Sequence, residues 1–220
     1  MSKAILVDTT RCTACRGCQL ACKDWYELPA NKTKQTGTHQ NPPDLNVNNY
    51  KIVRFSERLT EEGRVVWNFF PDQCRHCEAP PCVAEADSYI EGAMFKDEKT
   101  GAVLVNHELF AKISAEDTET IAESCPYNIP RYDAKKKTIA KCTMCYNRVE
   151  AGMVPACVKS CPTGAMMFGD RDEVLAFAEK RLAVVKKEFP KAFIADADDV
   201  SVFYLLAEEG KYYHEFASQY

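Results

Sequence analysis

The chain has 220 residues, 46% of them hydrophobic, which is enough to bury an ordinary core in one large domain or two small ones. Its 28 lysines and arginines are spread among 32 aspartates and glutamates, and this balance argues against nucleic acid as a partner. No secretion signal is recognisable, and no apolar run approaches the ~20 residues of a membrane-spanning helix, so we expect a globular protein without a membrane span.

Several short elements are predicted in chain order. A strand is predicted over residues 4–7, and residues 24–50 form a long polar segment that contains Pro29, Gly37, Pro42 and Pro43 and lacks periodicity. Further strands are predicted at residues 65–70 and, as a hairpin, at residues 93–96 and 102–105.

Two helices are predicted in the second half of the chain. Ser114, with Asp117 three residues later, is typical of a helix start, and that helix extends to about residue 124. Apolar residues at helical spacing predict the clearest helix over residues 170–189, which Pro190 ends.

Twelve cysteines fall into four groups. Thiols of a chain made without a secretion signal stay reduced, and neighbouring Cys-x-x-Cys pairs are typical of metal or redox sites, so metal ligation is favoured over disulfides. The groups are Cys12, Cys15, Cys18 and Cys22; Cys74, Cys77 and Cys82; Cys125; and Cys142, Cys145, Cys157 and Cys161.

The two outer groups resemble the cysteine run of two-cluster ferredoxins, C-x2-C-x2-C-x3-C-P, in which the fourth cysteine ligates the other cluster. The last group has eleven residues where two are expected, and it ends at Pro162. Exchanging the fourth cysteines therefore predicts two 4Fe-4S clusters. The first uses Cys12, Cys15, Cys18 and Cys161, and the second uses Cys22, Cys142, Cys145 and Cys157.

The middle groups form an incomplete version of the same pattern. Three cysteines and the later Cys125-Pro126 complete one further site, on Cys74, Cys77, Cys82 and Cys125. The positions of the other four ligands hold Ala86, Ala115, Thr118 and Ile121. The pattern thus predicts three 4Fe-4S clusters, with a fourth site lost as a unit.

Zinc is the main competing metal, because the last group could form a zinc ribbon from its two cysteine pairs. Zinc sites are usually built from two separated pairs, so the triplet that begins at Cys12 argues against this alternative.

Other side chains lie close to the cysteines in the sequence. His76 could replace a thiolate as in Rieske centres, but twelve cysteines already complete three sites, so a loop histidine bonded to backbone or water is favoured. Positive charges beside the cysteines would favour the reduced state of a cluster, although each is equally well explained as a surface charge. These residues are Arg11, Arg16, Arg75 and Lys141.

The motifs around the cysteines carry a resemblance. They are residues 11–18 (RCTACRGC), 73–82 (QCRHCEAPPC), 125–130 (CPYNIP), 141–145 (KCTMC) and 155–165 (PACVKSCPTGA). With them, the chain resembles the four-cluster ferredoxin family that provides iron-sulfur subunits of molybdopterin oxidoreductases. The loop of residues 36–45 and the count of three clusters favour the small subunit of soluble formate dehydrogenases of sulfate-reducing bacteria.

We therefore expect an α+β fold with two ferredoxin-like 4Fe-4S domains, short strands, long cluster loops and a C-terminal helical segment. The first domain would comprise residues 1–60 and 135–170 and hold two clusters. Residues 61–134 would hold the third cluster, and residues 171–220 would form the helical segment.

The resemblance also implies an electron-transfer subunit that works with a molybdenum or tungsten pterin catalytic subunit and a soluble multihaem cytochrome c. No motif of a catalytic site stands out on this chain. The family resemblance implies a periplasmic location, reached with a signal-bearing partner, and the cytoplasm is the alternative. A subunit of another molybdopterin oxidoreductase, such as a polysulfide or thiosulfate reductase, and a free-standing polyferredoxin stay open as alternative functions, as does a zinc-stapled structural protein.

Overall fold

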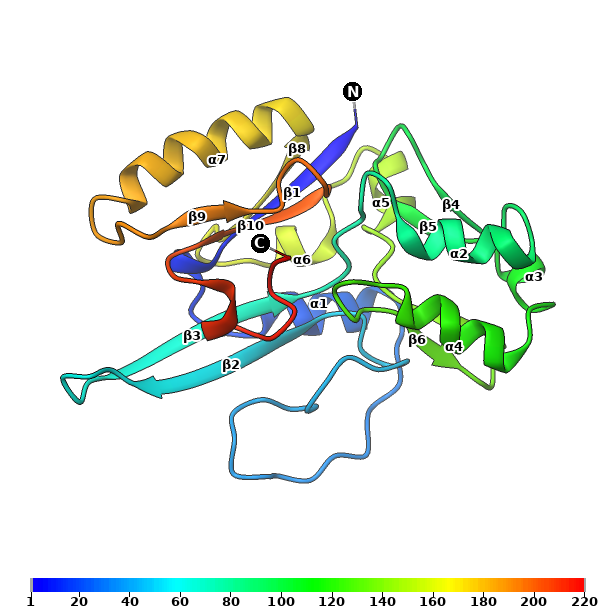
Figure 1. Ribbon diagram of the computed structural model, residues 1–220, viewed down its shortest axis with the longest axis horizontal. Coiled ribbons are helices and arrows are strands. Elements are labelled where there is room, and N and C mark those ends of the chain that lie inside the picture. The colour runs from blue at the N-terminus through cyan, green and yellow to red at the C-terminus, as the bar shows by residue number, and fades with distance from the viewer. Residues whose placement is uncertain (1, 220) are drawn as a thin grey trace.

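A four-stranded sheet joins the two ends of the chain in the computed structural model, which describes residues 2–219 (Figure 1). The central strands β1 (Lys3–Asp8) and β10 (Val202–Leu206) are parallel, while the outer strands β8 (Met166–Asp170) and β9 (Phe193–Ala195) pair antiparallel with them. Residues from both ends of the sequence therefore form one layer.

Both faces of this sheet are covered, which explains why β1 and β10 are almost entirely apolar. Leu6 and Phe203 face helix α7 (Arg171–Val185) and share a core with its Val174 and Ala178. On the other face, Ile5 shares a core with cysteines and other residues of the loops. The sheet thus lies between one long helix and the cysteine-bearing segments.

The expected C-terminal helical segment is only partly helical, and this prediction is corrected. The helix ends at Val185, before the predicted residue 189, and β9, β10 and the 3₁₀ turn η2 (Gly210–Tyr212) follow. Residues 202–206 are fully buried between two layers, so they lack the alternating pattern by which a strand is recognised from sequence.

Short helices follow the outer cysteine groups and the first strand. A 3₁₀ turn η1 (Thr9–Arg11) leads from β1 into the first cysteine loop, and α1 (Gly17–Trp25) follows it. Helix α5 (Tyr146–Glu150) forms the start of the insertion in the last group, and α6 (Ala156–Lys159) begins at the last residue of the insertion. Helices α1 and α6 contact each other, which brings the two outer cysteine groups together.

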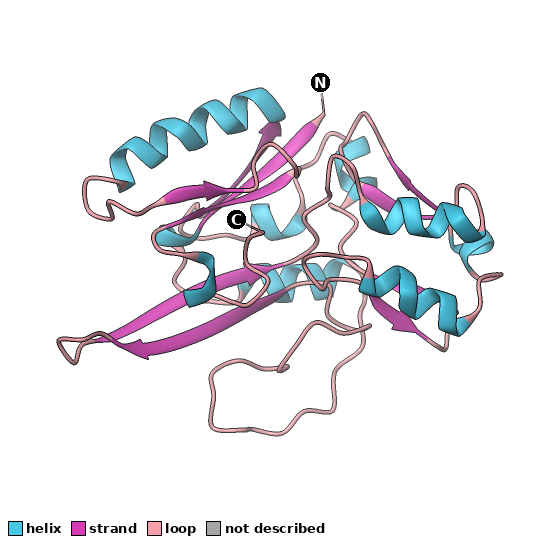
Figure 2. Cartoon of the chain, viewed as in Figure 1, coloured by secondary structure: helices cyan, strands magenta, loops and turns pink. Residues whose placement is uncertain are grey.

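A long hairpin projects from the body of the protein (Figures 1 and 2). It consists of β2 (Ile52–Leu59) and β3 (Val65–Asp72), and it spans the expected domain boundary at residues 60 and 61. The polar segment before it contains no helix or paired strand after α1, and only an isolated bridge links Asn46 and Asn49.

The middle of the chain forms a separate group of small elements at one side of Figure 1. They are α2 (Pro81–Tyr89), β4 (Met94–Lys96), β5 (Val103–Val105), α3 (His107–Phe110), α4 (Ala115–Glu123), β6 (Arg131–Asp133) and β7 (Thr138–Ala140). The predicted hairpin and the predicted cap at Ser114, whose hydroxyl accepts the Asp117 N–H, are confirmed.

Three of the four positions without a ligand lie in the packing between α2 and α4. Ala86, Thr118 and Ile121 are at most 1% exposed, whereas Ala115 is exposed at the start of α4. Ala86 and Ile121 share a core with Phe110. Ordinary side-chain packing therefore occupies the region where we expected a lost site.

Among residues 2–219, no helix combines the length and apolar character needed to cross a membrane.

The turn between β4 and β5 docks against the sheet at Gly101, and this contact can be tested. A Cβ at Gly101 would lie 2.9 Å from the Ser201 hydroxyl oxygen and 3.0 Å from the Lys3 carbonyl oxygen. Gly152 has the same φ of +73° with no atom within 4 Å of such a Cβ. We predict that Gly101→Ala lowers the free energy of unfolding by about 1–3 kcal/mol more than Gly152→Ala, measured by anaerobic urea denaturation. Equal losses would contradict the close contact.

Candidate metal centre

The first Cys-x-x-Cys pair in each of the three groups that contain such a pair has the same local backbone feature. The residue before the second cysteine is left-handed in each, with φ of 52° at Ala14, 51° at His76 and 53° at Met144. A left-handed backbone costs a residue other than glycine about 1–2 kcal/mol. Strain repeated at equivalent positions is typical of functional sites.

Each loop also directs a backbone N–H at its first cysteine sulfur. The His76 N–H donates to Cys74 Sγ at 3.5 Å, and the Met144 N–H donates to Cys142 Sγ at 3.3 Å. In the first loop, burial raises the pKa of Cys12 to about 11, and a hydrogen bond from the Ala14 backbone N–H partly opposes this rise. Such bonds favour a thiolate over a thiol.

The first predicted set of thiols gathers around the start of α1. Burial, followed by the nearby charges of Cys161 and Cys15, raises the pKa of Cys18. Burial also acts on Cys161, but hydrogen bonds from the Thr163 hydroxyl and backbone N–H groups outweigh it, so the pKa of Cys161 lies below its usual value. Cys161 is thus an electrostatic neighbour of the first cysteine group, far from it in sequence.

The second predicted set is the most buried. Burial raises the pKa of Cys22 strongly, and the nearby thiolates of Cys142, Cys157 and Cys145 raise it further. All four side chains are at most 8% exposed. Cys22 therefore interacts with the last cysteine group.

The third predicted set lines a common cavity between the loop after β3 and the start of α2. Burial raises the pKa of Cys77, and the charges of Cys74, Cys125 and Cys82 raise it further. Burial raises the pKa of Cys82 to about 12, although Lys141 opposes this effect.

The three sets adjoin in one order. Cys157 of the second set interacts with Cys18 of the first, and Cys142 of the second set interacts with Cys74 of the third. The second set therefore lies between the other two.

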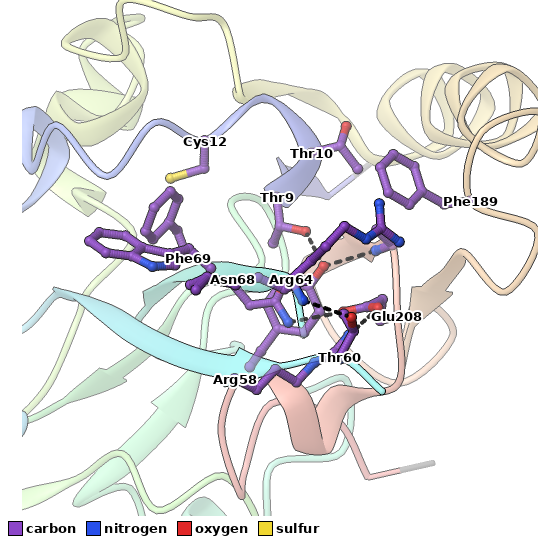
Figure 3. A pocket seen from close by; sticks show the side chains of 15 residues that line it. Thr9, Thr10, Cys12, Arg58, Thr60, Arg64, Asn68, Phe69, Phe189 and Glu208 are labelled. Atoms are coloured by element: carbon purple, nitrogen blue, oxygen red, sulfur yellow. Dashed lines mark hydrogen bonds and ion pairs between the residues drawn. The ribbon is translucent and has the colours of Figure 1, made fainter. Parts of the chain in front are cut away.

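Both outer sets reach the surface. Cys15 is exposed, and Cys12, Cys77, Cys125 and Cys161 are half-buried. Figure 3 shows the Cys12 thiol at the edge of a surface pocket of about 480 Å³, between the N-terminal segment and the β2–β3 hairpin, where Arg58 and Asn68 both contact Glu208. A partner on this side would approach the first set.

The position of Cys161 bears on the zinc-ribbon alternative. All twelve cysteines are free of disulfides. Among residues 2–219, no group of three or more Cys, His, Asp or Glu side chains is arranged to hold a single metal ion. Cys161 also interacts with the first set, so the zinc-ribbon alternative is not supported.

Three buried donors without a partner belong to residues close to Cys74 in the sequence. Within the described part of the chain, five buried side-chain nitrogen atoms lack a hydrogen-bond partner, and three of them belong to Gln73, Arg75 and His76. Buried polar groups normally have partners, and sulfur atoms of an iron-sulfur cluster accept such hydrogen bonds. Of these three residues, Arg75 lines the cavity that the third set shares, so its free N–H suits a sulfur-rich group there.

The expected histidine bonded to the backbone is confirmed. The Val103 N–H donates to His76 Nδ1 at 2.9 Å, and the imidazole is fully buried. Burial, with Lys141 and Lys96 nearby, holds the pKa of His76 well below its usual value, so the ring is neutral.

Of the four basic residues beside the cysteines in sequence, two are buried and two lie outside the core. Arg75 and Lys141 are at most 4% exposed, whereas Arg11 is exposed and Arg16 is half-buried. Sequence reasoning missed another buried cation, Lys51, because it is 23 or more residues from any cysteine. Only its position among polar residues before a strand could have suggested an unusual lysine.

The chain is similar to known iron-sulfur subunits. Residues 65–171 match the family model described as a 4Fe-4S dicluster domain. Formate dehydrogenase 2 subunit beta (cytochrome c-553) of Nitratidesulfovibrio vulgaris is 66% identical over 217 residues, with 99% of each chain covered. Formate dehydrogenase subunit beta of Megalodesulfovibrio gigas is 52% identical over 217 residues, again with 99% of each covered. The nitrate-inducible formate dehydrogenase iron-sulfur subunit of Escherichia coli is 33% identical over 96% of this chain and 71% of its own length.

The grouping of the thiols predicts the order in which they become reactive. If anaerobic protein is briefly oxidised, treated with an iron chelator and alkylated, mass spectrometry should find the first set labelled together and before the second, because Cys15 is exposed and the second set is buried. Labelling of Cys161 together with Cys142, Cys145 and Cys157 would contradict this grouping.

Proposed function

The chain belongs to the family of formate dehydrogenase beta subunits, the iron-sulfur subunits that transfer electrons in these enzymes, and we propose that it carries three 4Fe-4S clusters in a row. The observation that carries this proposal is the grouping of twelve thiols into three adjoining sets of four. Each 4Fe-4S cluster, when bound, supplies a one-electron carrier.

The proposed ligands follow the three sets, and the two ferredoxin-like units remain part of this proposal. The first cluster uses Cys12, Cys15, Cys18 and Cys161; the second uses Cys22, Cys142, Cys145 and Cys157; the third uses Cys74, Cys77, Cys82 and Cys125. Equivalent loop conformations and N–H donors support the roles of the three Cys-x-x-Cys pairs.

The proposed relay begins at the first set and ends at the third. We place the molybdenum or tungsten pterin subunit beside the first set, which is the most exposed. The buried second set separates it from the third. This arrangement supports transfer between two surfaces of the chain without a catalytic site on it.

A soluble c-type cytochrome is the proposed acceptor at the third set. The name of the Nitratidesulfovibrio vulgaris relative includes cytochrome c-553, which supports this class of carrier. The multihaem type expected from the sequence stays a prediction. We further propose a periplasmic location reached with a signal-bearing catalytic partner.

Replacing one ligand of the third set tests the direction of the relay. In the complex with the catalytic subunit, we predict that Cys82→Ser slows formate-dependent cytochrome reduction about tenfold or more, because an altered ligand changes the last carrier. Formate oxidation with an artificial dye that accepts electrons from the catalytic subunit should be spared.

Ser88→Ala is the matched control, since Ser88 lies exposed on the same helix and bonds only its own helix backbone. This variant should keep both activities. Equal loss of cytochrome and dye activity in Cys82→Ser would contradict the proposed order.

A further inference from the structure

Lys51 is a buried cation without an acidic partner. Its side chain is 2% exposed, and none of the ion pairs among residues 2–219 includes it. The ammonium donates to the Pro71 carbonyl oxygen at 3.3 Å and to the Gln73 side-chain oxygen. Both acceptors are neutral, so neither balances the charge.

A buried charge without a counter-charge costs several kcal/mol. The nearest carboxylate in the adjoining strand, Asp72, is already bonded to Arg54 and Arg75. The compensating negative charge must therefore come from elsewhere in the core.

Thiols of two different sets supply the negative charge around Lys51. Val53, two residues after Lys51 and on the same face of the extended segment, packs in one buried cluster with Cys18 of the first set and Cys157 of the second. The Val53 N–H also donates to the side-chain oxygen of Gln19, the residue after Cys18. The first and second sets meet at Cys18 and Cys157, and both of these residues interact with Lys51. Lys51 therefore lies beside the contact between the two sets.

The third set has its own cations. Lys141 acts on Cys82, and Arg75 acts on Cys125. Lys141 is also a buried lysine with neutral acceptors, the carbonyl oxygens of Val103 and Cys142. It is the natural comparison for Lys51, because both place a buried ammonium near thiols.

We propose that Lys51 is a fixed positive charge shared by the first and second clusters, and that it raises the reduction potentials of both. This inference rests on the proposed function, since it requires those clusters. Reduction adds negative charge to a cluster, and a nearby buried cation stabilises that charge more than it would in water. A charge placed between two carriers acts on both, which keeps either from becoming a deep electron trap relative to the other.

The alternative is a purely structural lysine that anchors β2 to β3 through Pro71 and Gln73. The two roles predict different reduction potentials for a variant that loses the charge but keeps a hydrogen-bond donor. A structural lysine would leave the potentials unchanged, whereas the proposed role would lower them. Lys51→Gln retains a donor without charge, Lys51→Met removes both, and Lys51→Arg retains the charge.

The test is a redox titration of the purified complex with its catalytic subunit, followed by electron paramagnetic resonance and accompanied by iron analysis. The signal of the third cluster is identified by its change in Cys82→Ser. We expect Lys51→Gln and Lys51→Met to raise the ratio of oxidised to reduced cluster at least tenfold at a given potential, for both the first and the second cluster. For a one-electron carrier, this corresponds to a reduction potential lower by about 59 mV. The same ratio for the third cluster should change by less than about threefold. Lys51→Arg should keep the ratios of the original protein.

Lys141→Met is the matched control and should shift the third cluster most. A shift below about threefold in the first two clusters, or an equal shift in all three, would overturn the proposal. If both uncharged variants fail to bind iron while Lys51→Arg binds it, the requirement for charge is supported; failure of all three variants would favour the structural role. Absence of the three cluster signals from the original complex would instead overturn the proposed function.

Discussion

The three proposed clusters require four thiols to meet at each of three points, although the cysteines that supply them lie far apart in the sequence. The strongest consequence is that the two ends of the chain interlock, because the proposed first cluster adds Cys161 to the first cysteine group and the proposed second cluster adds Cys22 to the last. The pairing of β1 with β8 and the contact between α1 and α6 hold these segments side by side. These contacts keep the two outer cysteine groups close to each other.

Collecting so many thiols in a core creates an electrostatic problem. Burial and mutual repulsion raise the pKa of thiols in all three sets, which disfavours the thiolates needed as ligands. The chain opposes this with backbone N–H groups directed at sulfur and with buried cations, Lys51, Arg75 and Lys141. Iron itself would supply the remaining positive charge when bound.

The cysteine spacing was the most informative part of the sequence. Ligand runs are local, so the grouping of Cys12, Cys15 and Cys18 and the exchange with Cys161 could be proposed before the structure. Helix α4 and the β4–β5 hairpin were also predictable, because a cap and a turn mark them locally.

Features that depend on contacts between distant segments were missed or misjudged. Strand β10 is buried on both faces by residues from elsewhere in the chain, so its sequence lacks the alternating pattern of a strand. From sequence alone, it is therefore predicted as part of a helical segment. The left-handed backbone at Ala14, His76 and Met144 has no glycine to mark it. The proposed role of Lys51 depends on the packing of β2 beside cysteines of two groups, which no local pattern indicates.

The most direct test is anomalous diffraction at the iron absorption edge from anaerobically grown crystals of the complex. The account predicts three compact iron peaks on this chain, each surrounded by one of the three cysteine sets, with the set containing Cys22 in the middle. Peaks at the zinc edge instead, or a peak that Cys161 shares with Cys142, Cys145 and Cys157, would contradict it.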